Sequence, residues 1–288
     1  MSDRPSRRIV LIDGGLSTAL EDLGVDTDGP LWTARALVDR LDDLESAHTA
    51  FITAGAQIIT TASYQCPATD EKMLRASTSI ARRAVAGTST RVAASVGPYG
   101  AILADGSEYH GRYPVSFDVV SDHHRRKLSV LVDSGPDLLA VETQPRADEA
   151  RIIADLLCDL GAPPAWFSFC FGDESTTCGG DSIPDVLAAV ADYPDLVAVG
   201  VNCTSPSLVA PILRRMRAVS SDLPLVVYPN HGGHWRAEDR TWIAPESPVN
   251  QGRWLEECLD IGVDYLGGCC GVGPADLARL VEEVRTRP

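Results

Sequence analysis

The feature that most constrains the fold is the regular alternation of two kinds of segment along the 288-residue chain. Short apolar runs of strand length are followed by longer segments with apolar residues at helical spacing. We expect strands at 8–12, 57–62, 91–96, 137–142, 165–171, 196–201, 223–228 and 263–266. We expect helices at 17–23, 32–37, 41–55, 71–86, 119–134, 148–160, 183–191, 208–219, 250–262 and 274–285. This alternation predicts parallel strands joined by right-handed crossovers.

About eight strand–helix repeats predict an α/β fold that closes into a single (β/α)8 TIM barrel over residues 1–288. A barrel of this type typically takes about 250 residues, so the length fits. A hydrophobic content of 44% supplies ample material for its core. The alternative is an open, doubly wound sheet. The segment 99–116 is rich in glycine, tyrosine and polar residues and is predicted to be a long loop, a type of segment that is often functional.

The charge balance excludes some partners. A net charge of −15 argues against nucleic acid, because phosphates require a basic surface. It remains compatible with a cationic small substrate. No apolar run of 18 residues is present, and the first eight residues are polar and basic, so we expect no membrane partner and a soluble, cytoplasmic protein.

Polar residues follow the predicted strands, where a TIM barrel places its active site. They are Asp13, Ser63, Glu142, Asn202, Cys203, Asn230, Cys269 and Cys270. Each alone could be a turn former or a helix cap. Glu142 is harder to explain in that way, because an acid directly after an apolar strand needs a partner or a ligand. Their joint placement predicts a site at the mouth of the barrel.

Three cysteines are the strongest candidates for metal ligands. Cys269 and Cys270 follow the eighth predicted strand with glycines on both sides, and Cys203 follows the sixth. Only one strand separates the sixth strand from the eighth, so the three sulfur atoms can converge. Three protein ligands leave one coordination position open, as in catalytic zinc sites, whereas structural zinc usually has four. Three thiolates leave Zn²⁺ with a formal charge of −1 (+2 − 3), which favours a sulfur substrate.

Other interpretations of these residues remain open. Cys269 and Cys270 could form a vicinal disulfide or be inert core thiols. The chain could also be a zinc hydrolase, or a zinc store or redox sensor. Cys158 and Cys258 are predicted to fill the core, and Cys66, Cys170 and Cys178 to be core or loop thiols. His123 and His124 are predicted to be solvated, whereas His231 and His234 could approach the mouth.

Five motifs, in order, resemble the homocysteine S-methyltransferase family, which includes betaine-homocysteine methyltransferase and the homocysteine domain of methionine synthase. The motifs are Asp13-Gly14-Gly15 with Thr18, Leu20 and Glu21; Ile59-Thr60-Thr61-Ala62-Ser63-Tyr64-Gln65; Gly97-Pro98-Tyr99-Gly100-Ala101 with residues 103–109; Gly200-Val201-Asn202-Cys203; and Gly267-Gly268-Cys269-Cys270-Gly271. The likeness spans about residues 10–280. The segment 97–111 is most similar to the branch that uses S-methylmethionine or S-adenosylmethionine.

The resemblance implies a TIM barrel and a zinc ion held by Cys203, Cys269 and Cys270, with homocysteine thiolate as the fourth ligand. It also implies that Asp13 and Glu142 recognise the amino-acid end of homocysteine. Gly14 and Gly15 would offer backbone contacts, and Asn202 would lie beside the metal.

The reaction so implied is methyl transfer from a sulfonium donor to homocysteine, forming methionine. Tyr64 could contact the sulfonium through its ring or simply pack. One departure concerns the segment 228–233, which reads Tyr-Pro-Asn-His-Gly-Gly instead of the Tyr-Pro-Asn-Ser-Gly-Glu usual among S-methylmethionine-type members. His231 could replace a contact there. A betaine-like donor or a selenocysteine acceptor are the alternatives.

Overall fold

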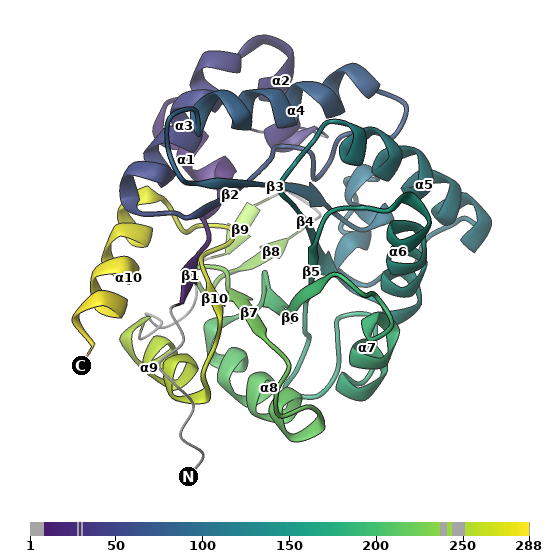
Figure 1. Cartoon of the computed structure of the whole chain (residues 1–288), viewed down its shortest axis with the longest axis vertical. Coiled ribbons are helices and arrows are strands. Elements are labelled where there is room, and N and C mark those ends of the chain that lie inside the picture. The colour runs from purple at the N-terminus through teal and green to yellow at the C-terminus, as the bar shows by residue number, and fades with distance from the viewer. Residues whose placement is uncertain (1–8, 28, 30, 237–240, 244–250, 288) are drawn as a thin grey trace.

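A computed structural model describes residues 9–27, 29, 31–236, 241–243 and 251–287. Within them, eight parallel strands form a barrel that a ring of helices surrounds (Figure 1). The strand order is β1-β10-β7-β6-β5-β4-β3-β2, and a parallel bridge between Ile12 and Ile58 joins the two ends. The predicted TIM barrel is therefore confirmed. The organisation of residues 1–288 as a single domain stays a prediction.

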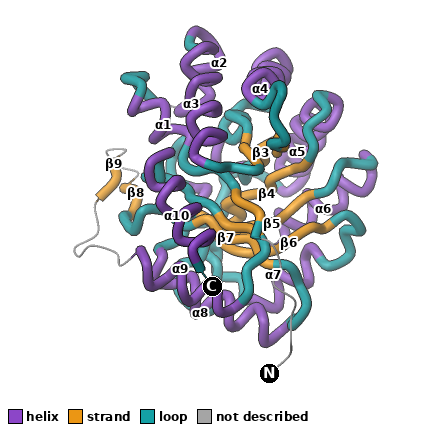
Figure 2. The backbone as a smooth tube through the Cα atoms, turned by 60° about the vertical axis from the view of Figure 1, so that its left-hand side comes forward, coloured by secondary structure: helices purple, strands orange, loops and turns teal. Residues whose placement is uncertain are grey.

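The barrel strands are short and agree in position with the sequence pattern. They are β1 (Val10–Leu11), β2 (Ile58–Thr60), β3 (Arg91–Val96), β4 (Leu138–Gln144), β5 (Ala165–Phe169), β6 (Leu196–Asn202), β7 (Leu225–Tyr228) and β10 (Tyr265–Leu266). Two further strands, β8 (His234–Arg236) and β9 (Thr241–Ile243), form a hairpin that the sequence analysis missed. Figure 2 shows this hairpin projecting from the barrel, apart from the helices.

The helices alternate with the strands, as the apolar spacing predicts. They are α1 (Leu16–Asp22), α2 (Ala36–Asp39), α3 (Leu41–Ala54), α4 (Glu71–Ala84), α5 (Phe117–Asp133), α6 (Ala147–Leu160), α7 (Ile183–Val190), α8 (Pro206–Val219), α9 (Gln251–Ile261) and α10 (Pro274–Thr286). The predicted loop 99–116 contains two short 3-10 helices, Tyr99–Ile102 and Ser107–Tyr109, and a third spans Trp32–Arg35. The predicted element ends Arg8 and Asn250 lie outside the described residues.

Side chains that alternate along the strands divide the core in two. One set packs between the strands and the helices, and the other fills the inside of the barrel. On β5, Trp166 points inward between smaller residues from neighbouring strands, and its Nε1–H donates to the hydroxyl of Tyr228 at 2.9 Å. The interior is thus packed solid, which leaves the ends of the strands as the place for a site.

Among the described residues, no helix is both long and apolar enough to cross a membrane.

Candidate active site

The carboxyl ends of the barrel strands surround a cavity of about 520 Å³. Residues at the ends of β1, β2, β4, β6 and β10 contribute to its wall, as the TIM-barrel prediction requires. The predicted site residues on this wall are Asp13, Gly14, Gly15, Tyr64, Glu142, Cys203, Cys269 and Cys270. Segments far apart in the sequence therefore meet in one cavity.

Three thiols converge in the cavity. The Sγ atoms of Cys203, Cys269 and Cys270 all lie within 4.8 Å of one another. The Cys203–Cys270 separation is 3.6 Å and the Cys269–Cys270 separation is 4.0 Å. Two sulfur ligands on a tetrahedral zinc ion, with Zn–S bonds of about 2.3 Å, lie about 3.8 Å apart. The spacing of the cluster therefore fits a zinc ion.

Electrostatics also favours a cation among the thiols. The contact with the Cys203 thiol, together with burial, raises the pKa of Cys269 well above that of an ordinary thiol. Three thiolates this close repel one another, so a bound cation is needed to stabilise the ionised cluster. All eight cysteines of the chain are free, which leaves these three available as ligands.

The glycines around the cysteine pair fit the cysteine loop into the fold. A Cβ on Gly268 would lie 2.2 Å from a methyl carbon of Val272, so only glycine fits there. Gly271 adopts a φ of +78°, which glycine takes without strain. The N–H of Cys269 donates to the carbonyl of Pro229, and the carbonyl of Cys270 accepts from the N–H of His231. These glycines thus let the cysteine loop pack closely against neighbouring parts of the chain.

Cys203 is held in an unusual backbone conformation. It follows β6 with a φ of +47°, in the left-handed region that few non-glycine residues occupy. Its N–H donates to the carbonyl of Tyr228 at 3.2 Å, and its own carbonyl accepts from Asn230 Nδ2 at 3.4 Å. These bonds to β7 and to the loop that follows turn the thiol toward the cysteine pair.

Asp13 lies at the end of β1 and is almost fully buried. Its carboxylate accepts hydrogen bonds from the N–H of Thr60 at 2.7 Å and from the Thr60 hydroxyl at 3.1 Å. Burial raises the pKa of Asp13 well above its usual range, and the nearby Glu142 raises it further. A positively charged ligand would stabilise the ionised form of Asp13 and so lower its pKa.

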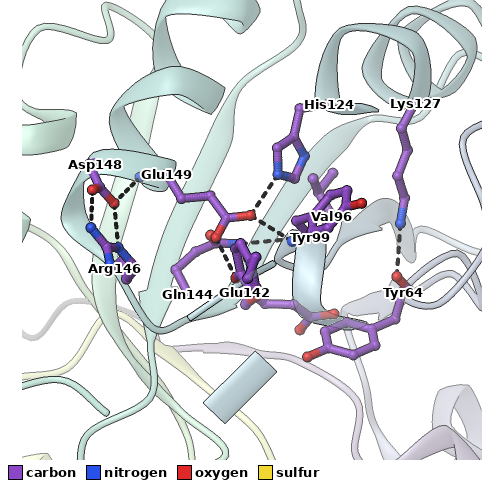
Figure 3. A network of polar contacts seen from close by, with 11 residues as sticks. Tyr64, Val96, Tyr99, His124, Lys127, Glu142, Gln144, Arg146, Asp148 and Glu149 are labelled. Carbon is purple, nitrogen blue, oxygen red and sulfur yellow. Dashed lines mark hydrogen bonds and ion pairs between the residues drawn. The ribbon is translucent and has the colours of Figure 1, made fainter. Parts of the chain in front are cut away.

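Glu142 faces the same cavity from β4 and accepts a short hydrogen bond from the hydroxyl of Ser95. Burial raises the pKa of Glu142, against the effect of the Ser95 and Tyr228 hydroxyls and of Lys127. Lys127 is fully buried on α5, and its ammonium donates to the carbonyl of Tyr64 at 2.8 Å (Figure 3). The sequence analysis missed Lys127, because a lysine on an amphipathic helix normally indicates the solvated face.

Aromatic side chains form much of the remaining wall. Tyr64 and Trp32 contact edge to face, with ring centroids 6.3 Å apart, and Tyr109 and Tyr228 complete the set. Such faces accommodate a cationic methyl-bearing group. Sequence analysis pointed to Tyr64 alone. The others carried a weaker signal, since Trp32 lies in a predicted helix and Tyr109 in a predicted loop.

The segment 97–113 is fastened by one buried carboxylate. Glu149, on α6, accepts from the N–H of Tyr99 at 2.6 Å and from the hydroxyl of Tyr113 at 2.6 Å, and it contacts His124 Nε2 at 2.8 Å (Figure 3). His124 is fully buried, so its predicted exposure to solvent is wrong. The face of α5 that carries His124 packs against α6, and Glu149 supplies the partner that burial requires.

Three predicted mouth residues lie behind the cavity wall. Ser63 and Asn202 are fully buried, and Asn230 is 6% exposed. Asn202 accepts from the N–H of Thr143 at 2.7 Å and donates to its hydroxyl at 2.8 Å, and its Nδ2 lies 4.0 Å from the Sγ of Cys269. Its contact with substrate stays a prediction, whereas its contacts with the site residues Thr143 and Cys269 are direct.

The remaining cysteines and histidines differ in how deeply they are buried. Cys258, Cys66 and Cys170 are buried, as predicted, and Cys178 is half-buried. Cys158 is exposed, so its prediction as a core residue is wrong; the buried stripe of α6 includes Ile153, Ala154, Leu156 and Leu157, and Cys158 lies outside it. His231 is exposed and lies off the cavity wall. The side chain of His234 lies outside the described residues.

Fold and site together define a class: a TIM barrel whose mouth carries three convergent thiols within an acidic, aromatic-lined cavity. The homocysteine S-methyltransferase family model matches residues 10–284. The chain belongs to this family of enzymes.

Named relatives support the assignment to this family along nearly the whole chain. A homocysteine S-methyltransferase of Escherichia coli is 38% identical over 94% of both chains. A selenocysteine Se-methyltransferase of Brassica oleracea is 35% identical over 96% of this chain and 89% of that protein. The crystal structure of the metallated form of the E. coli homocysteine methyltransferase MmuM matches with a TM-score of 0.83, at 36% identity over 96% of both chains. A structure of this relative thus holds a metal.

Proposed function

We propose that this protein transfers a methyl group from a sulfonium donor to the thiolate of homocysteine, forming methionine, with a zinc ion held by Cys203, Cys269 and Cys270. The observation that carries the proposal is the convergence of the three Sγ atoms within 4.8 Å at the wall of a cavity. Soft sulfur ligands suit a site whose substrate is itself a thiol. The names of the relatives support homocysteine as acceptor. A cytoplasmic location, which keeps thiols reduced, is part of the proposal.

Zinc, when bound, would lower the pKa of the acceptor thiol so that a thiolate exists at neutral pH. The chain's own contribution is binding and orientation. Asp13 and Glu142 accept the ammonium end of homocysteine, with Gly14 and Gly15 beside them on the wall. An ammonium there offsets the burial and the repulsion from Glu142 that raise the pKa of Asp13.

The transfer itself needs little acid–base chemistry. A new sulfur–carbon bond forms at the homocysteine sulfur while the donor's sulfur–methyl bond breaks. The electron pair of the broken bond stays on the donor sulfur, which leaves as a neutral thioether. The thiol proton is lost to solvent before the transfer. The protein therefore accelerates the reaction mainly by aligning the thiolate with the methyl group.

The aromatic wall contributes to donor binding. Tyr64, Trp32, Tyr109 and Tyr228 lie along the cavity, and Tyr64 is half-buried there. Aromatic faces attract cations by about 0.5–2 kcal/mol, and this attraction weakens when the sulfonium becomes a neutral thioether. Tyr64 belongs to the donor side of the site in this proposal.

A selenol acceptor is the second candidate function. The Brassica oleracea relative is named for selenocysteine, and it is nearly as similar to this chain as the homocysteine enzymes are. A selenolate is softer than a thiolate and suits the same three-sulfur site. Comparing kcat/KM for homocysteine and selenocysteine, with one donor, decides between the acceptors.

The test of the proposal is to replace each ligand cysteine by serine and to measure bound zinc and methionine formation together. Cys203→Ser, Cys269→Ser and Cys270→Ser should each lower both by at least about tenfold, because a hydroxyl is a much poorer zinc ligand than a thiolate. Cys158→Ser is the matched control, since this thiol is exposed and far along α6, and it should leave both unchanged. Full methyl transfer by a zinc-free preparation would overturn the proposal.

A panel of donors with homocysteine then identifies the methyl source. S-Methylmethionine, S-adenosylmethionine and betaine are compared by the methionine that each yields. A hydrolase, a zinc store or a redox sensor would yield methionine with none of them.

A further inference from the structure

Four carboxylates line the cavity, and one of them differs from the rest. The four are Asp13, Glu21, Glu108 and Glu142, and the described lining residues include no lysine, arginine or histidine. Asp13 accepts from Thr60, Glu21 from the hydroxyl of Thr27, and Glu142 from Ser95. Glu108 is 7% exposed, and its Oε2 finds no hydrogen-bond partner among the described residues.

A second unpartnered acceptor lies on the same wall. Gln65 is 7% exposed and lines the cavity, and its Oε1 likewise lacks a partner within the described chain. Buried acceptors without a donor are costly and therefore rare, so each needs an explanation. Both side chains border the cavity, so a ligand with N–H groups would supply the missing donors once the side chains turn these oxygens toward it.

The fold holds Glu108 in this position despite the cost. Ala104 adopts a left-handed φ of +52° and Gly106 one of +85°, which turns the chain back toward the barrel just before Glu108. Asp105 accepts from the N–H of Ser107 and closes the turn, and the Glu149 network fastens the same segment at Tyr99 and Tyr113. Burial raises the pKa of Glu108 to about 7. A positively charged ligand would stabilise the ionised form.

We propose that Glu108, with Gln65, binds the ammonium group of the methyl donor and so makes the enzyme selective for amino-acid sulfonium donors. The inference rests on the proposed function, in which Asp13 and Glu142 already take the ammonium of homocysteine. A sulfonium centre has no N–H, so it cannot satisfy Glu108 and Gln65, whereas the aromatic faces can accept it. The donor's ammonium can satisfy both acceptors.

The experiment compares Glu108→Gln with the wild-type, zinc-loaded enzyme on two donors, with homocysteine as acceptor. S-Methylmethionine carries an ammonium group, and dimethylsulfonioacetate is a sulfonium carboxylate without one. Loss of a charged hydrogen bond costs about tenfold or more in affinity, so the KM for S-methylmethionine should rise by that factor. The KM for dimethylsulfonioacetate and for homocysteine should change by less than about twofold.

Two controls distinguish a loss of donor recognition in Glu108→Gln from a disturbance of the fold. Asp118→Asn removes an exposed carboxylate in the first turn of α5, off the cavity wall, and should leave both donors unaffected. The melting temperature of Glu108→Gln at pH 8 should equal or exceed that of the wild type. A carboxyl whose folded-state pKa is raised destabilises the fold above that pKa, and glutamine removes that charge.

Equal losses on both donors, no loss on either, or a rise in the KM for homocysteine alone would overturn the inference. Each of these leaves the proposed function intact, because the wild-type enzyme still forms methionine. A wild-type enzyme that uses no sulfonium donor would overturn the proposed function and this inference with it.

Discussion

Thr143 adopts a left-handed φ of +58°, and it is both β-branched and 3% exposed. Such a conformation costs about 1–3 kcal/mol and persists only where surrounding groups enforce it. Asn202 enforces it here by pairing with both the N–H and the hydroxyl of Thr143. Because Thr143 follows Glu142 and Asn202 precedes Cys203, this pair joins the carboxylate side of the cavity to the thiol side.

Asn202→Ala should therefore lower the free energy of unfolding by about 2–4 kcal/mol, since it leaves the buried N–H of Thr143 without an acceptor. Urea denaturation measures this loss, and zinc content should fall in the same variant because the neighbouring Cys203 loses its support. Thr143→Gly is the matched control: glycine accepts the left-handed φ without strain, so this variant should lose less stability. An Asn202→Ala protein as stable as the wild type would contradict the bridging role.

The sequence predicted the convergence of the three cysteines but not the conformation of Thr143. Cys203, Cys269 and Cys270 carry their chemistry in the side chain, and the strand pattern places them at one end of the barrel. A threonine at the end of a strand carries no local signal for a positive φ. That conformation arises only when β4 and β6 bring Asn202 beside Thr143, which is a contact 59 residues apart in sequence.

At the scale of elements, α6 determines where the segment 97–113 lies. Glu149 in its first turn is fully buried and receives donors from two points of that segment and from α5. The spacing of apolar residues predicted the strands and helices, but it did not predict these contacts of Glu149. A glutamate in the first turn of a helix is normally explained by its favourable interaction with the helix dipole. The sequence therefore gave no reason to expect a tertiary contact for Glu149.

Glu149→Ala should loosen the segment 97–113, because three donors lose a common buried acceptor. We expect faster amide hydrogen exchange in residues 99–113 and a free energy of unfolding lower by about 2–4 kcal/mol. The KM for the methyl donor should rise, since Glu108 belongs to this segment. Asp155→Asn, an exposed change on the same helix, is the control and should alter none of these. Unchanged exchange in residues 99–113 would show that Glu149 does not fasten the segment.

The whole molecule is strongly acidic, and so is its cavity. The net charge is −15, and the four cavity carboxylates lie at one end of the barrel without a described basic residue on the wall. Composition alone predicted a cationic small molecule as a compatible partner, but it could not show where the negative charge would gather. A cavity lined by one sign of charge concentrates oppositely charged ligands and speeds their association.

Association of a cationic donor should therefore depend on ionic strength. Raising the salt concentration from about 0.01 M to about 0.15 M shortens the screening length from about 30 Å to about 8 Å. We expect kcat/KM for S-methylmethionine, which carries a net positive charge, to fall several-fold over this range. Dimethylsulfonioacetate has no net charge and serves as the control, so its kcat/KM should change little. Equal salt dependence for the two donors would mean that the acidic cavity does not attract its substrate over a distance, and that its carboxylates act only after contact.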